Sequence, residues 1–268
     1  MAGLTESDTS LALRSLLGAS ARGARVVTAL PSKKSRAFLI EADVGDHGPC
    51  REGDAWAPAS LRLEPLVLKI YQAPGPAERE AAVLAELARA GVTAPRLVKA
   101  SDIALLRSYT VGPVARDLHC GTAFTRSLAR WLHLFHRTLA QGAPHRTWLV
   151  GDMNLGNFVI DVACGQVCGI DFGDSREGNP MDDVGEGCMR IVSHRPGFTM
   201  DRWASAVAFV REYGGLAGAE EKACRDVVPF AVRAFERMSV WREDRVMADM
   251  ALAFPQLWAS AVDSCASG

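Results

Sequence analysis

Residues 150–157 read Val-Gly-Asp-Met-Asn-Leu-Gly-Asn, and residues 169–174 read Gly-Ile-Asp-Phe-Gly-Asp. Strand-like runs at 158–161 and 167–172 follow the first segment and enter the second, so we expect a hairpin that brings Asn157 near Asp171. A carboxylate oxygen beside an amide oxygen suits Mg²⁺, which also takes phosphate oxygens and water. Asp152 is then left facing any group that approaches a metal-bound phosphate. This arrangement suits phosphoryl transfer, with one carboxylate as the base.

A second polar pair precedes this region. Lys69 lies inside the apolar, strand-like run 66–71, where an unpaired ammonium would be very costly to bury. The next helix is bounded by Gly75-Pro76 and Gly91, and helical spacing places Glu80 on its apolar stripe. An inward Glu one element after an inward Lys predicts the partner of a phosphate-binding lysine. The pair alone leaves open an edge-strand Lys and a solvated Glu.

The remaining pattern separates strands from helices. We expect a helix at 9–17 after a cap at Asp8 or Ser7, strands at 26–30, 37–42 and 103–106, and a loop over 43–65. A helix is expected at 124–140, and the chain beyond Asp201 has a mostly helical pattern. A strand-rich first third before a helix-rich remainder predicts the α+β class.

The five polar residues Lys69, Glu80, Asp152, Asn157 and Asp171 stand in the order of the protein-kinase-like signature set, which the chain therefore resembles. The short Gly-Asp-x-x-x-x-Asn loop and the Ile-Asp-Phe-Gly-Asp run look more like aminoglycoside phosphotransferases and choline kinases. The segment 178–184, Gly-Asn-Pro-Met-Asp-Asp-Val, also resembles that group. The resemblance covers roughly residues 20–200.

This resemblance implies a two-lobed α+β fold, with a β-rich nucleotide-binding lobe at 1–108 and a helical catalytic and substrate lobe at 109–268. It implies ATP, with GTP as the alternative, and Mg²⁺ as cofactors. Lys69 is assigned to the α- and β-phosphates and Glu80 to holding Lys69. Asp152 is assigned as catalytic base, and Asn157 and Asp171 as metal ligands. Asp183 matches a carboxylate that steadies the catalytic loop.

Other contacts that the resemblance implies are less specific. The strip 106–110, including Ser108 and Tyr109, corresponds to the hinge whose backbone would bind adenine. The turn 31–36 contains no glycine, so Ser32 and Ser35 are candidate phosphate contacts, although an ordinary hairpin turn explains them equally well. The chain departs from the group's pattern at three positions, where Val150 and Asn154 replace histidines and Asn179 replaces an aspartate.

Composition sets outer limits. The chain has 268 residues, 49% of them hydrophobic and 23% charged, which is typical of a globular protein of one or two domains. Its formal net charge of −1 does not favour nucleic acid as a partner. There is no signal-like start and no apolar run long enough for a membrane helix. Seven irregularly spaced cysteines indicate reduced thiols, so we expect a cytoplasmic protein without a membrane partner.

These observations predict a kinase that phosphorylates a hydroxyl of a small molecule, such as an amino sugar, an amino alcohol, an antibiotic or a related metabolite. The alternatives are a kinase of a protein, lipid or glycan, and a pseudokinase that binds nucleotide without turnover. Six acidic residues against one basic residue between Asp171 and Glu186 make a cationic acceptor one option. The oligomeric state stays open.

Overall fold

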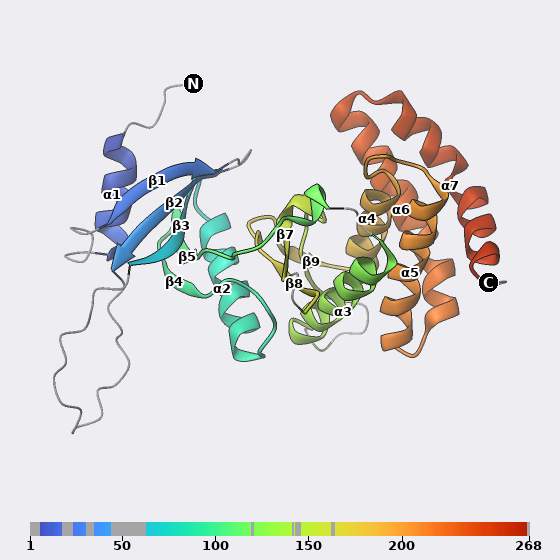
Figure 1. Cartoon of the computed structure of the whole chain (residues 1–268), viewed down its shortest axis with the longest axis horizontal. Helices are drawn as coiled ribbons and strands as arrows, with labels where there is room; N and C mark the ends of the chain where they lie inside the picture. The colour runs from blue at the N-terminus through green and yellow to red at the C-terminus, as the bar shows by residue number, and fades with distance from the viewer. Residues whose placement is uncertain are drawn as a thin grey trace. The chain divides into compact units, whose positions relative to one another are not determined.

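The computed structural model describes residues 6–17, 24–30, 35–43, 63–118, 121–140, 142, 146–161 and 164–266. The chain divides into two compact units (Figure 1). The first unit comprises Met1–Ala85 and Pro95–Tyr109, and the second comprises Glu86–Ala94 and Thr110–Gly268.

The first unit contains a five-stranded antiparallel sheet in the order β1-β2-β3-β5-β4. Its strands are β1 (Arg25–Leu30), β2 (Ser35–Asp43), β3 (Leu63–Tyr71), β4 (Leu97–Ala100) and β5 (Ala104–Ser108). Strands β2 and β3 pair without a break from Ser35 opposite Tyr71 to Asp43 opposite Leu63. This long register fixes which residues of β3 point to each face of the sheet.

The two faces of the sheet differ in chemistry. On one face, the even-numbered residues of β3 form an apolar core with Leu13 and Leu16 of helix α1 (Glu6–Leu17). The odd-numbered residues, Lys69 among them, point to the opposite face. Helix α2 (Pro76–Arg89) supplies that face with the fully buried side chain of Glu80. The alternation along one strand therefore presents Lys69 to α2 while its neighbours hold the core.

The second unit is mainly helical (Figure 1), with α3 (Thr122–Thr138), α4 (Pro180–Val192), α5 (Met200–Leu216), α6 (Glu220–Arg242) and α7 (Arg245–Ser264). Two small antiparallel sheets accompany the helices. One pairs β6 (Thr147–Leu149) with β9 (Arg176–Gly178), and the other pairs β7 (Phe158–Asp161) with β8 (Gln166–Gly169). An aromatic cluster joins α3 to the β7–β8 region. Its members are Trp131, Phe135, Phe158 and Phe172.

Most expected elements are present, and the differences have local causes. Helix α1 begins at Glu6, so Ser7 and Asp8 lie within its first turn and are not its cap. At the two ends of the expected loop 43–65, Asp43 belongs to β2 and residues 63–65 belong to β3. Residues 44–62 and Gly18 lie outside the described residues. Strands β4, β6 and β9 were not expected. Runs of three or four residues show no measurable period, and no adjoining motif marks these three as the loop motif marks β7.

Two further findings concern the described part of the chain as a whole. No helix in it is long and apolar enough to cross a membrane. No disulfide joins the cysteines at positions 164, 168, 188, 224 and 265, the ones within that part.

Candidate active site

Lys69 and Glu80 form a buried ion pair in the first unit. The Lys69 Nζ lies 2.6 Å from Glu80 Oε2, and the two side chains are 4% and 0% exposed. The Tyr71 hydroxyl also donates to Oε2. The predicted pairing is thus confirmed, and the alternative of a solvated glutamate is wrong. Burying two charges is tolerated here because the partners and their hydrogen bonds compensate each other.

A second cation approaches the same carboxylate. Arg107 of β5 is buried, and its Nε lies 3.7 Å from Glu80 Oε1. At that distance the contact is an ion pair and not a hydrogen bond, and neither atom has a hydrogen-bond partner in the part of the chain that the structure describes. Another guanidinium nitrogen of Arg107 donates to the Ser108 carbonyl at 3.2 Å. Within the described residues, the Glu80 carboxylate is therefore approached by two buried cations.

In the second unit, Asp152 lies in a loop whose backbone is held from α4. The buried carboxylate of Asp183 accepts the Val150 N–H at 2.6 Å and the Gly151 N–H at 3.2 Å. The His136 Nε2 lies 3.1 Å from Asp183 Oδ2. An ionised carboxylate can only accept, so Nε2 carries the proton in this pair. Asp183 thereby fixes the two residues that precede Asp152, as the resemblance implied.

The other side of His136 meets Tyr213, whose hydroxyl lies 2.9 Å from Nδ1. Burial, with the nearby Asp183 charge, raises the pKa of Tyr213, so the phenol stays protonated. The loop anchor is therefore a chain of three buried polar groups from α4, α3 and α5.

Two local features let the chain pass this point. Gly151 has φ +86°, and a Cβ there would lie 2.2 Å from the Asp174 carbonyl oxygen, so only glycine fits. Asn179 caps α4 by accepting the Met181 N–H at 3.0 Å, with Pro180 as the first helical residue. The asparagine in place of aspartate at 179 is thus a sound helix cap.

The predicted metal ligands come from adjoining segments. The Ile170 N–H donates to the Asn157 carbonyl at 2.9 Å, so Asp171 immediately follows the residue bonded to Asn157. The Asn157 Nδ2 donates to the Asp152 carbonyl at 3.1 Å, which leaves its side-chain oxygen as the ligand atom. Asp171 Oδ1 accepts the Gly173 N–H at 3.2 Å.

This donor set fits Mg²⁺. An amide oxygen and a carboxylate are hard ligands, and Mg²⁺ is usually completed by water and substrate phosphates. The described residues contain no group of three or more His, Cys, Asp or Glu that could hold a metal ion. A two-ligand site completed by phosphate differs from a closed all-protein cage, which would need such a group.

The remaining predicted contacts are placed less decisively. Ser35 is buried at the start of β2, and Ser32 lies outside the described residues. The Ser108 N–H donates to the Arg96 carbonyl at 2.9 Å, and the Tyr109 N–H donates to the Pro65 carbonyl at 3.0 Å. Both hinge amides are therefore already used within the first unit. An adenine contact at these residues would have to use their carbonyls or side chains.

No protein-family model and no curated protein sequence matches this chain. Solved structures do. The chain is similar to an amicoumacin kinase in complex with AMP-PNP and Ca²⁺, with TM-score 0.66, 11% identity and coverage of 97% of this chain and 94% of that one. It is also similar to the Plasmodium vivax ethanolamine kinase, with TM-score 0.60, 9% identity and coverage of 85% and 78%.

A third similar structure is an aminoglycoside phosphotransferase from Streptomyces rimosus in complex with ADP and streptomycin. Its TM-score is 0.54 at 15% identity, with coverage of 79% of this chain and 92% of that one. The chain has the fold of the choline kinase and aminoglycoside phosphotransferase group. The resemblance drawn from the sequence and the two-lobed α+β class are confirmed at the level of the fold.

Within this kinase-like fold, sequence reasoning missed one contact of Asp152. Arg190, in the last turn of α4, places Nη2 3.1 Å from Asp152 Oδ1. Its Nε and Nη2 also donate to Glu186 Oε1, at 3.2 Å and 2.8 Å. The spacing of four between Glu186 and Arg190 could have indicated their pairing. Nothing in the sequence indicated the contact with Asp152, 38 residues away.

The acidic stretch from Asp171 to Glu186 is compensated by arginines from other segments. Arg146 pairs with Glu177 at 2.5 Å, and Arg233 lies 3.4 Å from Asp182. Arg190 pairs with Glu186 as above. The local count of charges therefore overstates the negative charge that the folded kinase-like unit presents.

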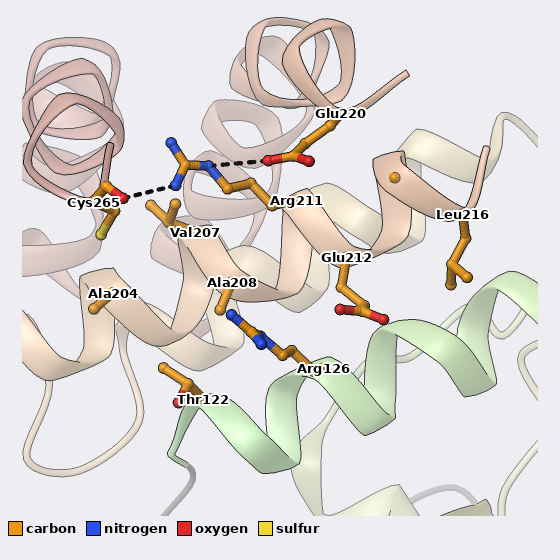
Figure 2. A pocket seen from close by; sticks show the side chains of 11 residues that line it. Thr122, Arg126, Ala204, Val207, Ala208, Arg211, Glu212, Leu216, Glu220 and Cys265 are labelled. Atoms are coloured by element: carbon orange, nitrogen blue, oxygen red, sulfur yellow. Dashed lines mark hydrogen bonds and ion pairs between the residues drawn. The ribbon is translucent and has the colours of Figure 1, made fainter. Parts of the chain in front are cut away.

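The same unit has a cavity of about 490 Å³ between α3 and α5, with Glu220 and Cys265 at its edge (Figure 2). Arg211 spans one side, bonded to the Cys265 carbonyl at 3.0 Å and 3.5 Å from Glu220. None of the predicted site residues lines this cavity. Arg211 holds α7 and the start of α6 to α5, and Glu212 pairs with Arg130 of α3, so these charged groups have structural partners.

Proposed function

We propose that the chain is an ATP-dependent phosphotransferase that moves the γ-phosphoryl group to a hydroxyl of a small molecule. The observation that carries the proposal is the anchored loop of the second unit. The Asp183 carboxylate accepts the Val150 N–H just before Asp152, and the Asn157 side chain donates to the Asp152 carbonyl. Asp171 follows Ile170, whose N–H donates to the Asn157 carbonyl. The kinase-like fold supports the same reaction, and side chains of matching chemistry stand at the matching motif positions.

Asp152 is the base in this proposal. Its carboxylate accepts the proton of the acceptor hydroxyl as the acceptor oxygen bonds to the γ-phosphorus. The bond from that phosphorus to the β,γ-bridging oxygen breaks, and the electron pair leaves with ADP. The loop anchor matters because a base contributes only when its oxygen is held at the reacting hydroxyl.

Asn157 and Asp171 hold Mg²⁺, which neutralises charge on the phosphates when it is bound. Lys69 binds the α- and β-phosphates, and Glu80 keeps its ammonium in place. Ser108 and Tyr109 contact the adenine ring of ATP. GTP is the alternative phosphate donor. Ser32 and Ser35 are the proposed contacts of the β1–β2 turn.

The acceptor is a small molecule with a free hydroxyl, such as an amino sugar, an amino alcohol or an antibiotic. The similar structures support this size class, because those proteins are named as kinases or phosphotransferases of ethanolamine, amicoumacin and aminoglycosides. A cationic acceptor stays a prediction. The arginine partners of Asp182 and Glu186 remove part of the charge on which that prediction depended.

Calorimetric titration with ATP, with and without Mg²⁺, tests the nucleotide site. We expect Mg²⁺-dependent binding to the wild type, and its loss in Asp171→Ala. The variant Asp152→Asn should bind Mg·ATP with nearly wild-type affinity and transfer no phosphoryl group. The matched control is Asp161→Asn on the exposed end of β7, which should bind and react as the wild type does.

Each failure has a distinct meaning. Equal turnover in Asp152→Asn would overturn the assignment of the base. Binding of Mg·ATP with no turnover on water or on any amino sugar, amino alcohol or antibiotic would favour the pseudokinase. Turnover on a protein, lipid or glycan alone would favour the second kinase alternative. No binding of ATP or GTP under any condition would overturn the proposal as a whole.

A further inference from the structure

Arg190 touches the proposed base, and it is not a solvent-exposed ion-pair partner. Its side chain is 14% exposed, that of Glu186 is 12% exposed and that of Asp152 is 30% exposed. Surface ion pairs contribute little because water competes for both partners, whereas this guanidinium is largely withdrawn from water. The contact is therefore a defined part of the structure around Asp152.

Glu186 fixes the direction of the Arg190 guanidinium. It lies one turn earlier on α4 and accepts from both Nε and Nη2 on the single oxygen Oε1. A planar guanidinium held at two nitrogens has little rotational freedom, so the Nη2 that reaches Asp152 is pre-set. On its other side, Glu186 Oε2 lies 3.9 Å from Arg237 of α6.

The carboxylates of Asp152 and Glu186 need a cation between them, and Arg190 is that cation. Burial raises the pKa of Glu186, and the nearby Asp152 and Asp183 carboxylates raise it further, while Arg190 lowers it. Arg190 is thus the cation placed between two carboxylates that would otherwise repel each other. Without Arg190, Asp152 would lose one hydrogen-bond donor, and this cation would no longer separate its carboxylate from that of Glu186.

The two oxygens of Asp152 have different surroundings. Oδ1 accepts the Asn154 N–H at 3.2 Å and the Arg190 Nη2 at 3.1 Å. Among the residues that the structure describes, none donates to Oδ2. A carboxylate anchored through one oxygen keeps the lone pairs of the other for an incoming proton.

We propose that Arg190 is a positioning residue: it anchors Oδ1 of Asp152 so that Oδ2 receives the proton of the acceptor, and Glu186 holds Arg190 in that orientation. This inference rests on the proposed function. It assigns to α4 a part in aligning the base as well as in anchoring the loop through Asp183.

The test compares full-length Arg190→Gln and Arg190→Lys with Arg233→Gln, the matched control. Arg233 of α6 pairs with Asp182 of α4, the helix that carries Arg190, and no contact between Arg233 and Asp152 is present. The reaction measured is hydrolysis of Mg·ATP with water as the acceptor, and the binding measured is calorimetric affinity for Mg·ADP. Melting temperatures identify any variant that fails to fold.

We expect Arg190→Gln to lower kcat about tenfold to a hundredfold, the range seen when a reacting group is misplaced by about 1 Å. The KM for Mg·ATP and the affinity for Mg·ADP should stay within about twofold of wild type, because the arginine acts on the base and not on the nucleotide. Arg190→Lys should retain part of the rate, and millimolar guanidinium should restore part of it to Arg190→Gln. Arg233→Gln should match the wild type.

The inference is overturned if Arg190→Gln reacts as fast as the control or faster, since the ion pair would then be neutral or inhibitory. A fall in kcat accompanied by an equal fall in Mg·ADP affinity would show a merely structural role and overturn it as well. If Arg190→Gln does not fold, Arg190→Lys decides by the same criteria. A wild type that binds no nucleotide overturns the proposed function, and the inference with it. An active wild type with an inactive Asp152→Asn but an unaffected Arg190→Gln overturns the inference alone.

Discussion

Asp183 Oδ2 accepts the backbone N–H of Val150 at 2.6 Å, across 33 residues of sequence. The same carboxylate accepts from Gly151 and contacts His136, so all the donors around it face a negative charge. The loop that carries Asp152 is therefore fixed from the first turn of α4.

Asp183→Asn should destabilise the protein strongly. The amide NH₂ would face donors, and the buried His136 and two backbone N–H groups would lose a charged acceptor. We expect a loss of about 3–5 kcal/mol in the free energy of unfolding, the range for breaking a buried pair. Urea unfolding measures it. Asp182→Asn, next to it and partly exposed, should cost less than about 1 kcal/mol, and equal losses would contradict the anchor.

Glu80→Gln and Lys69→Met should differ in stability, although they remove the two halves of one ion pair. Glu80→Gln leaves Lys69 and Arg107 buried beside a neutral amide, which we expect to cost about 3–5 kcal/mol. Lys69→Met leaves Glu80 with Arg107 and Tyr71, so the loss should be smaller. Thermal unfolding of both variants decides the order. A larger loss in Lys69→Met would mean that Arg107 does not compensate Glu80.

Arg107→Met should change the free energy of unfolding by less than about 1.5 kcal/mol in either direction. The arginine is buried, but among the described residues its Nε has no hydrogen-bond partner and lies 3.7 Å from Glu80, so the loss is limited to this weak ion pair and the hydrogen bond to the Ser108 carbonyl. Replacing a poorly paired buried charge with an apolar side chain of similar length is often neutral or stabilising. Chemical unfolding gives the value, and a loss as large as that of Glu80→Gln would refute the reasoning.

Gly185→Ala should loosen the packing of α4 on α6. An added Cβ would lie 2.6 Å from the backbone carbon of Phe230 and 2.7 Å from the Ala231 nitrogen, and backbone cannot move aside as a side chain can. Overpacking of this kind costs about 1–3 kcal/mol. The control is Gly121→Ala, where nothing lies within 4 Å of the new atom and φ is −84°. Gly121 is the N-cap of α3, where alanine is less favourable than glycine, so we expect the control to lose stability, but less than about 1 kcal/mol.

His133 should add to the loss of stability in mild acid. Burial, and then the charges of Arg137 and His136, lower its pKa below the usual 6.5 in the folded state. Between the lowered pKa and 6.5 the unfolded chain binds the extra proton, so stability falls as the pH drops through that window. His133→Asn should therefore lose less melting temperature than the wild type between about pH 7.5 and 5.5. An identical slope would exclude a contribution from this residue.

The sequence predicts those parts of the structure that depend on local pattern. The strand 158–161 follows from its short apolar run after the loop. The pairing partner of Lys69 follows from the position of Glu80 on the apolar stripe of its helix. The loop 150–157 follows from its motif. The roles in catalysis stay predictions, because geometry alone does not test them.

What the sequence does not predict are contacts between distant segments. The approach of Arg190 to Asp152 depends on how α4 returns over the loop, which no spacing encodes. Likewise, Arg107 meets Glu80 only because β5 pairs with β3 in one register. His136 carries no signal by itself, and its role emerges only from its contact with Asp183, 47 residues away on α4.

The anchoring of the Asp152 loop has a consequence for divergence. Asp183 accepts the main-chain N–H groups of residues 150 and 151. The contact at position 150 therefore does not depend on the side chain there, and valine is compatible with it. When a loop is held by its peptide groups, the residue type at such a position can change while the backbone conformation stays the same. Proteins whose loops are held through the main chain can lose detectable sequence similarity and still superpose on one another over most of their length.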